Sequence, residues 1–140
     1  MNDTANALER ARWYQQFVAG DFAGAAAHMA PDLVRDGPRV GDANNVIHGR
    51  DAYIAFLTEV YPTQKRIHES FVEEISASPD GRRAYVRCTE IDSLEPNSAE
   101  KVVAIRMLIE NHINDVGLIS RIDVFWKDPG IHYEWTGTEG

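Results

Sequence analysis

Residues 33–38, with the sequence LVRDGP, place an acidic side chain at the end of a short apolar stretch. Residues 33–36 are predicted to form a strand, and the glycine and proline that follow favour a turn. If Asp36 lies at the mouth of an apolar cavity, burial disfavours its charge and raises its pKa, which suits a general acid or base. If the turn is open to water, the same residue only helps to form it, and the spacing alone favours this turn role.

Four other side chains could take part in acid–base chemistry. Trp13 and Tyr14, on a predicted helix, could present an N–H or O–H group to a ligand, because a buried indole or phenol needs a partner. Arg106 interrupts an apolar strand and could stabilise a developing enolate if it pointed inward, although strict alternation favours the outward side. His48 could be an acid partner to Asp36, although a structural role at the start of a helix is favoured.

Metal and cofactor motifs are absent from the sequence. The five histidines are scattered, without the paired spacing that is typical of a metal site. Cys88 is the only cysteine, so no internal disulfide can form, and its position within a predicted strand indicates a small buried residue. No glycine-rich phosphate loop occurs. We therefore expect no metal and no cofactor.

The order of the predicted elements indicates an α+β fold. Helical spacing of apolar residues predicts a helix over residues 3–20, a short one over 22–30 and a third from about residue 50. Residues 37–49 are expected to form a polar loop. Runs rich in β-branched and aromatic residues predict four long strands, over residues 66–77, 82–94, 100–112 and 117–127. Because long strands twist and curl, we expect three N-terminal helices packed on a strongly curled, mostly antiparallel sheet, which forms a cone with one pocket.

Length and charge limit the class of protein. The 140 residues suit a single domain over residues 1–140, of which about 128–140 form a tail. The net charge of −8 opposes nucleic-acid binding and adsorption to an anionic membrane. No apolar run approaches the roughly 20 residues that a membrane helix needs. The first ten residues lack the basic and apolar regions of a signal peptide, so we expect a cytoplasmic protein.

Four segments carry a resemblance to a known family: ARWYQQFVAGD, PDLVRDGP, VIHGRDAYIAFL and GLISRIDVFW. Together they resemble the nuclear transport factor 2-like superfamily, in its branch of ketosteroid isomerases and SnoaL-like polyketide cyclases. The resemblance extends over about residues 8–126 and implies a conical fold around a small-molecule cavity. Because this fold hosts isomerases, cyclases, dehydratases, epoxide hydrolases and non-catalytic modules, the resemblance implies the fold more directly than the activity.

The resemblance also assigns roles to particular residues. It aligns Asp36 with the general base of the isomerases, an aspartate that moves a proton between two carbons of an enone. The tyrosine of the isomerase oxyanion hole falls on Trp13, and the protonated aspartate of that hole falls near Arg106 or Met107. This chain therefore lacks the family's phenol network and needs another donor. The candidates are the Trp13 N–H, Arg106, His48 and a water molecule.

These observations predict a cofactor-independent isomerase or cyclase of secondary metabolism. It would transfer a proton next to a carbonyl group of a hydrophobic, polyketide- or steroid-like substrate, with Asp36 as the acid or base. The expected catalytic residues are Asp36, Trp13, Arg106 and His48. The residues expected to bind the substrate are Tyr14, Phe17, Tyr53, Phe56, Leu57, Met107, Val124 and Trp126.

Two alternatives remain open. The limonene epoxide hydrolase branch of this fold uses an Asp-Arg-Asp set around a water molecule, and Asp92, Arg87 and Asp123 faintly resemble that set. This alternative needs one of the aspartates to point inward beside an arginine, whereas we expect both to be charges on the surface or a dimer face. The other alternative is a non-catalytic ligand-binding or dimerisation module. Family members usually pair through the outer face of the sheet, and we expect a homodimer here.

Overall fold

The computed structural model describes residues 2–39 and 42–127. Its helices are α1 (Asp3–Ala11), α2 (Trp13–Val18), α3 (Phe22–Ala26) and α4 (Arg50–Thr58), and one π-helical turn (Glu59–Thr63) follows α4. Its strands are β1 (Met29–Arg39), β2 (Asp42–His48), β3 (Ile67–Ala77), β4 (Arg83–Ser93), β5 (Val102–Ile113) and β6 (Ile119–Lys127). The tail expected at the C-terminus lies outside the described residues. None of the described helices has the length and apolar character needed to span a membrane.

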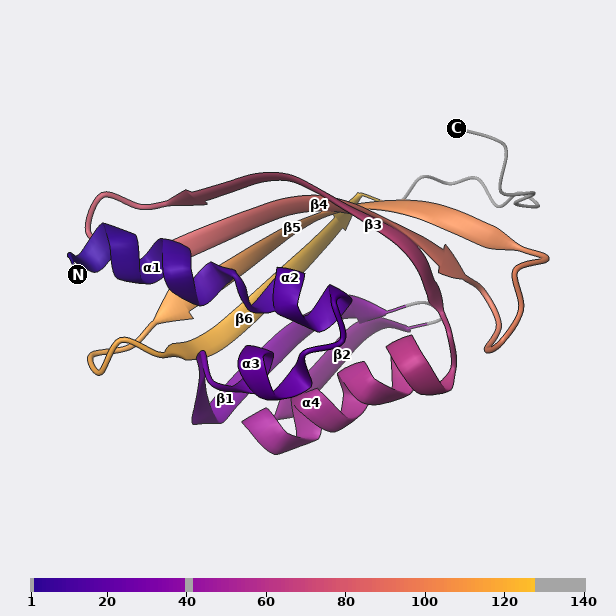
Figure 1. Cartoon of the computed structure of the whole chain (residues 1–140), viewed down its shortest axis with the longest axis horizontal. Helices are drawn as coiled ribbons and strands as arrows, with labels where there is room; N and C mark the ends of the chain where they lie inside the picture. The colour runs from indigo at the N-terminus through magenta and orange to yellow at the C-terminus, as the bar shows by residue number, and fades with distance from the viewer. Residues whose placement is uncertain (1, 40–41, 128–140) are drawn as a thin grey trace.

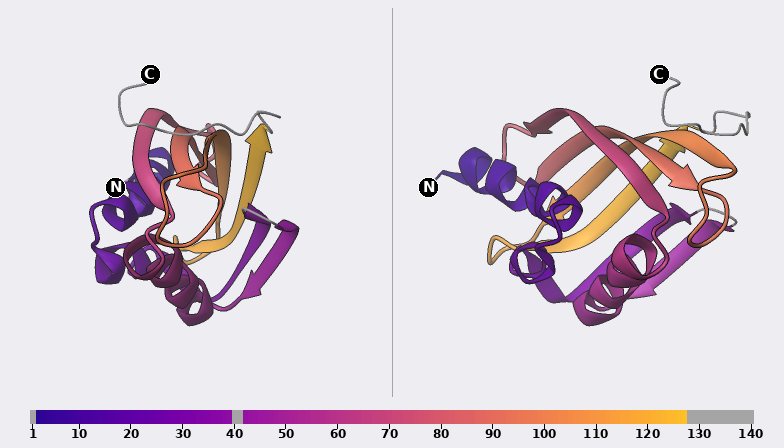
Figure 2. Two further views of the ribbon diagram at one scale, coloured as in Figure 1. Left: turned by 90° about the vertical axis from the view of Figure 1, so that its right-hand side faces the viewer. Right: turned by 45° about the vertical axis from the view of Figure 1, so that its right-hand side comes forward.

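The six strands form one mixed sheet in the order β2-β1-β6-β5-β4-β3. Strand β1 pairs with β6 in parallel, and all other neighbouring strands are antiparallel. The long strands bend together, as their twist requires, and the helices pack inside the curve (Figure 1). The side views in Figure 2 show β1 and β2 as one arm of the curved sheet and β3 and β4 as the other. The prediction of helical segments packed on a curled, mostly antiparallel α+β sheet is confirmed.

The predicted first helix is divided into α1 and α2 at Arg12. Strand β5 holds α2 in place through a buried hydrogen bond, in which Trp13 Nε1 donates to Oδ1 of Asn111 at 2.8 Å. The Asn111 amide donates in turn to the backbone carbonyl of Ala84 on β4 at 3.1 Å. Three aromatic side chains of α2 are thereby packed into the core: Trp13, Tyr14 and Phe17.

The prediction of a polar loop over residues 37–49 is wrong, because β1 and β2 occupy most of this segment. Backbone pairing, such as that of Gly37 with Asn45, continues the sheet in spite of the polar composition. The glycine permits close packing of β1 on β6. A Cβ atom at Gly37 would lie 2.7 Å from Cβ of Val124, which is too close for two carbon atoms.

Alternation along the strands gives the sheet an inner face under the helices and an outer face away from them. The buried apolar side chains of the central strands lie on the inner face: Ala84, Val86, Cys88, Ile105, Met107, Ile109, Ile122 and Val124. The outer face carries charged side chains and several exposed apolar ones, among them the cross-strand partners Leu108 and Phe125. The inner face is therefore the one that can form an apolar site.

Candidate active site

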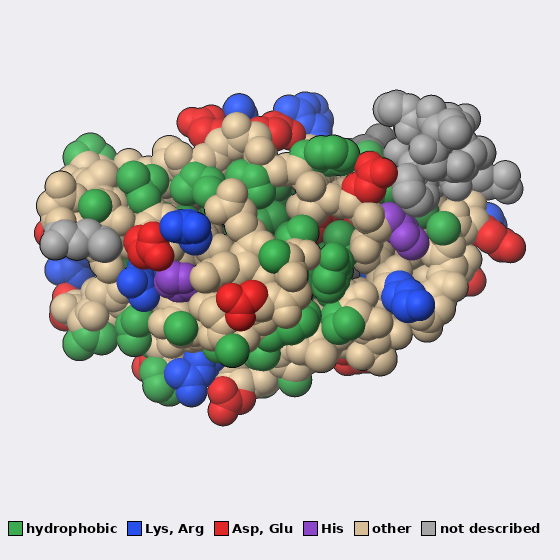
Figure 3. Space-filling view, in the orientation of Figure 1, with side chains coloured by type: hydrophobic (Ala, Val, Ile, Leu, Met, Phe, Trp, Pro, Cys, Tyr) green, Lys and Arg blue, Asp and Glu red, His purple; other side chains and the backbone are tan. Residues whose placement is uncertain are grey.

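A cavity of about 220 Å³ lies between the inner face of the sheet and helices α2 and α4. Most of its wall is aromatic or aliphatic, and Figure 3 shows hydrophobic side chains gathered over the middle of the face that carries these helices. Its charged or amide-bearing lining residues are Arg35 on β1, Glu90 and Asp92 on β4, and Glu59, Gln64 and Arg66 between α4 and β3. The two arms of the curled sheet therefore bring a cation and two carboxyl groups to opposite walls of one apolar space.

The two carboxyl groups are adjacent and buried. Glu90 and Asp92 are two residues apart on β4, so both face inward, and each is only 6% exposed. The Tyr14 hydroxyl donates to Oε2 of Glu90 at 2.5 Å and lies 2.7 Å from Oγ of Ser70 on β3. Because the phenol gives its proton to Glu90, Ser70 donates to the phenol oxygen. Oδ1 of Asp92 has no hydrogen-bond partner among the residues that the structure describes.

Their surroundings give the two carboxyls different roles. Burial raises the pKa of Glu90, whereas hydrogen bonds from Tyr14 and Asp92 and the charge of Arg35 lower it. Burial raises the pKa of Asp92 well above its usual range; the charge of Glu90 and a hydrogen bond to it raise this pKa further, and Arg66 lowers it. Glu90 is therefore the better stabilised anion, and Asp92 keeps its proton. A carboxylate beside a carboxylic acid can supply both a base and an acid.

Arg35 is a buried cation on the opposite wall and is only 5% exposed. Its guanidinium donates to the backbone carbonyls of Gly37 (3.0 Å), Pro38 (2.8 Å) and Asn45 (3.2 Å). Its Cζ atom lies 5.7 Å from the centre of the Phe56 ring, a distance at which a cation–π attraction acts. Among the described side chains, no carboxylate forms an ion pair with Arg35.

The residues expected to bind the substrate all lie along the cavity wall: Tyr14, Phe17, Tyr53, Phe56, Leu57, Met107, Val124 and Trp126. That they bind a substrate stays a prediction. Trp13, expected as a catalytic donor, also lines the cavity, but its N–H already donates to Asn111. The N–H of Trp126 has no partner in the described part of the chain and is better placed to bind an oxygen atom.

Asp36 does not face the cavity, so the prediction that it does is wrong. Its side chain is 41% exposed on the outer face and accepts a hydrogen bond from Nη2 of Arg121 at 3.1 Å. The physical reason is strand alternation: Leu33 is fully buried, so Arg35 shares its inner face and Asp36 points away. Parallel pairing of Asp36 with Asp123 places the two carboxylates side by side on the outer face.

Arg106 and His48 are also exposed and lie outside the cavity, so the structure does not bring them to the buried acid pair, and their catalytic role stays a prediction. Arg106 is on the outer face, as alternation along its strand favours. Arg87 lies on the same face and forms ion pairs with two glutamates of β3. Asp92 was expected on the surface or a dimer face, but it is buried and points into the cavity.

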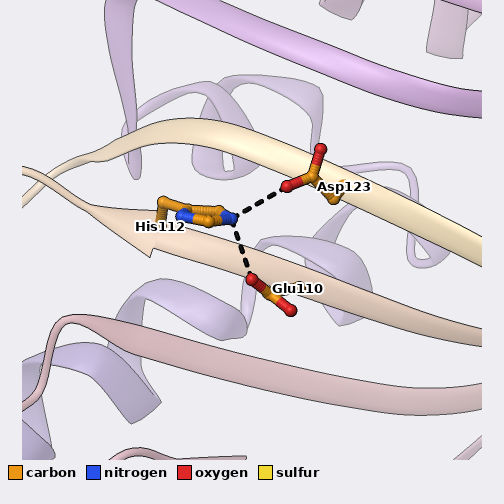
Figure 4. Close-up of side chains that lie close together, drawn as sticks. All are labelled: Glu110, His112 and Asp123. Carbon is orange, nitrogen blue, oxygen red and sulfur yellow. Dashed lines mark hydrogen bonds and ion pairs between the residues drawn. The ribbon is translucent and has the colours of Figure 1, made fainter.

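Asp123 belongs to a charged cluster on the outer face (Figure 4). Nε2 of His112 lies 2.9 Å from Oδ2 of Asp123 and 3.0 Å from Oε1 of Glu110. Arg121 forms an ion pair with Asp123, and Arg83 forms one with Glu110. Glu110, His112 and Asp123 could together ligate a metal ion. However, arginines already neutralise both carboxylates. We therefore interpret the cluster as a network of ion pairs.

Glu90 and Arg35 do not stand out as site residues in the sequence, although the sequence holds a signal for Glu90. Residues 84, 86, 88, 90 and 92 share one face of β4, and the first three are Ala84, Val86 and Cys88. A face that begins with small apolar residues must be the inner one, so the acidic pair has to be inside. For Arg35 the only such signal is that the apolar Leu33 lies two residues earlier and therefore shares its face of β1.

Residues 11–122 match the SnoaL-like domain family. No curated protein sequence matches the chain. Among solved structures, Bal32a from a soil-derived mobile gene cassette has a TM-score of 0.75 at 18% identity, covering 91% of this chain and 93% of that one. A steroid delta-isomerase from Pseudomonas aeruginosa has a TM-score of 0.66 at 19% identity, covering 90% and 82%. An LEH-like epoxide hydrolase from Mycobacterium tuberculosis has a TM-score of 0.64 at 19% identity, covering 89% and 84%.

These identities are low enough that the structural likeness establishes a shared fold and not a shared activity. The family match spans α2, α4 and strands β1 to β5, and hence both walls of the cavity described above. The chain therefore belongs to the SnoaL-like domain family.

Proposed function

We propose that the protein is a cofactor-independent enzyme that transfers a proton at a carbon next to a carbonyl group of a hydrophobic small molecule. The product would be an isomer or a cyclised form of a polyketide- or steroid-like substrate. The observation that carries this proposal is the pair of buried carboxyls, Glu90 and Asp92, facing an apolar cavity. Burying ionisable groups costs stability, and such groups in a cleft are typical of catalytic sites. A cytoplasmic location and a role in secondary metabolism are part of the proposal.

In the proposed reaction, Glu90 is the base and Asp92 is the acid. Glu90 removes a proton from the carbon next to the carbonyl group, and Asp92 gives its proton to the carbonyl oxygen, so that a neutral enol forms. Asp92 then takes the proton back from the enol oxygen while Glu90 delivers its proton to another carbon. Tyr14 holds Glu90 in place, and the free N–H of Trp126 offers a further donor to the oxygen.

Epoxide opening is a second candidate function, and the inward position of Asp92 favours it. Arg66 lies near enough for its charge to lower the pKa of Asp92, so an inward acid does lie beside an arginine. Asp92 would protonate the epoxide oxygen while Glu90 activates a water molecule for attack on carbon. Asp123 and Arg87, on the outer face, take no part.

Deuterium exchange distinguishes these candidates with simple model compounds in place of the natural substrate. The protein is incubated in heavy water with neutral aryl ketones such as 2-tetralone, and with epoxides such as limonene oxide, and the products are followed by nuclear magnetic resonance. We expect deuterium to enter the carbon next to the carbonyl group faster than in buffer alone. Diol formation without exchange would replace the first candidate by the second. Saturable binding of these compounds with neither reaction would identify a non-catalytic binding module.

We also propose that the protein is a homodimer whose second copy covers the outer face of the sheet. The helices leave this face uncovered, and Leu108 and Phe125 are 38% and 53% exposed at its centre. Each chain has a mass of 15.7 kDa, so light scattering at micromolar concentration is expected to give about twice that mass. A Phe125→Glu variant is expected to shift the mass toward the monomer, because it places a charge where the two copies meet. A monomeric wild-type protein would contradict the proposal.

A further inference from the structure

We propose that Arg35 anchors a carboxylate group of the substrate, and hence that the cavity takes a hydrophobic carboxylic acid. This inference rests on the proposed function, because it concerns the molecule held in the same cavity. Arg35 indicates the class of substrate, whereas the acid pair Glu90 and Asp92 indicates the reaction. Arg35 and the acid pair lie on different arms of the sheet, so each can be tested separately.

The charge of Arg35 is not matched by any described side chain in contact with it. Its hydrogen bonds to backbone carbonyls solvate the cation without neutralising it. The nearby Tyr53 does not neutralise it either, because burial raises the pKa of Tyr53 to about 12 and the phenol stays protonated. Nε of Arg35 has no acceptor among the described residues. A ligand carboxylate would supply the missing acceptor and an anion in contact with the guanidinium, whose charge otherwise acts on Glu90 across the cavity.

The guanidinium is also held in a fixed position. The three carbonyls come from the end of β1 and from β2, and the ring of Phe56 lies against the cation. A cation that is already ordered loses little further freedom when an anion binds, which favours affinity. Arg35 therefore has the properties of a preformed anion site at one end of an apolar cavity.

Arg66 is the other arginine of the cavity, and it is the weaker candidate. It donates to the backbone carbonyl of Leu94 at 3.1 Å and to the side chain of Gln64 at 2.8 Å. It lies near the acid pair and lowers the pKa of Asp92. Arg66 is also only half-buried, whereas Arg35 is buried, so water weakens the attraction between an anion and the cation less at Arg35. This difference in burial favours the Arg35 wall for a ligand carboxylate.

This arrangement also fixes how a substrate would lie. Its carboxylate would pair with Arg35, its apolar body would contact Trp126, Met107 and Val124, and its reacting carbonyl end would reach Glu90. A phosphate is a poorer fit, because it carries more charge and more acceptor oxygens than one guanidinium can satisfy. A carboxylate matches the planar guanidinium fork in both charge and shape.

Isothermal titration with two probes of equal shape tests the inference. Naphthalene-2-carboxylate carries the charge, and 2-naphthamide is its neutral counterpart. We expect the wild-type protein to bind the carboxylate at least about tenfold more tightly than the amide, as a charge-assisted hydrogen bond implies. Arg35→Gln is expected to bring this ratio close to one. Arg66→Gln, the matched control, removes a cation that does not contact the ligand carboxylate and is expected to lower the ratio by no more than about twofold.

A wild-type protein that binds the amide as tightly as the carboxylate would overturn the inference, whatever the variants do. Equal loss of the ratio in Arg35→Gln and Arg66→Gln would overturn it as well. If Arg35→Gln fails to fold by circular dichroism, Arg35→Lys serves in its place. It keeps the charge but loses the fork, and is expected to give a ratio between one and the wild-type value. A wild-type ratio retained in Arg35→Lys would contradict the proposed role of the fork.

The outcome is separable from that of the proposed function. Glu90→Gln is expected to lower deuterium exchange but to keep or increase the preference for the carboxylate, because it removes a repelling charge. A carboxylate preference without exchange in any ketone would leave the anion site standing and refute only the reaction. Exchange of neutral ketones without a carboxylate preference would refute only the anion site.

Discussion

Replacing Glu90 with glutamine is expected to lower the rate of deuterium exchange into a responsive ketone by at least about 10²-fold, the scale of general-base catalysis. Glutamine has nearly the same shape and can still accept the hydrogen bond from Tyr14, so the helix–sheet contact is kept. It cannot take up a proton, because an amide oxygen is a very weak base. The measurement is the initial exchange rate at saturating ketone, with binding of the same ketone measured in parallel.

Asp36→Asn is the matched control, since it makes the same chemical change at a carboxylate on the outer face. Its side chain contacts Arg121 and not the cavity, so we expect the exchange rate to stay within about twofold of the wild type, as for a surface change. The two variants together also compare two assignments of the catalytic carboxyl, one from family resemblance and one from burial. A slow Asp36→Asn enzyme with a normal Glu90→Gln enzyme would contradict the assignment to Glu90.

The fold could be predicted from the sequence because its signals are long and repeated. Four segments of 11 to 13 residues with β-branched and aromatic composition become the four consecutive strands β3 to β6, with ends that move by at most a few residues. Helical spacing located α2 and α4, whose aromatic residues line the cavity. Such signals average over many residues, so an error at one position does not change the architecture.

The site is harder to predict because it depends on which face a single residue occupies. A shift of one residue in a strand moves a side chain to the other face of the sheet. On β1 that shift exchanges Arg35 for Asp36, and the family resemblance favours Asp36. On β4 residue type alone favours a surface position for Asp92, because acidic residues are seldom buried. Only the packing of α2 on the sheet shows that Tyr14 supplies the partner that makes burial of Glu90 tolerable.

Asp92→Asn is expected to change how the stability of the protein depends on pH. The pKa of Asp92 is raised in the folded state, first by burial and then by the charge of Glu90. Above pH about 4 the unfolded chain releases this proton, whereas the folded protein keeps it until the pH reaches the raised folded pKa. The stability that Asp92 contributes is therefore fully present below the unfolded pKa and is lost as the pH rises toward the folded pKa. The wild-type protein should lose about 1.4 kcal/mol per pH unit more than Asp92→Asn over this range.

Urea unfolding at pH 5, 6, 7 and 8 measures this difference directly. Near pH 5 the two proteins should be closest in stability, and the advantage of Asp92→Asn should grow with each unit, to several kcal/mol by pH 8 if Asp92 is still protonated there. A plateau in the difference would mark the pH at which the folded protein loses the proton, and so would locate the folded pKa. Parallel curves would mean that Asp92 ionises equally in both states, and the acid assigned to the reaction would then be absent. Slow exchange in Asp92→Asn together with higher stability would show that the buried Asp92 carboxyl destabilises the fold at neutral pH while it serves the reaction.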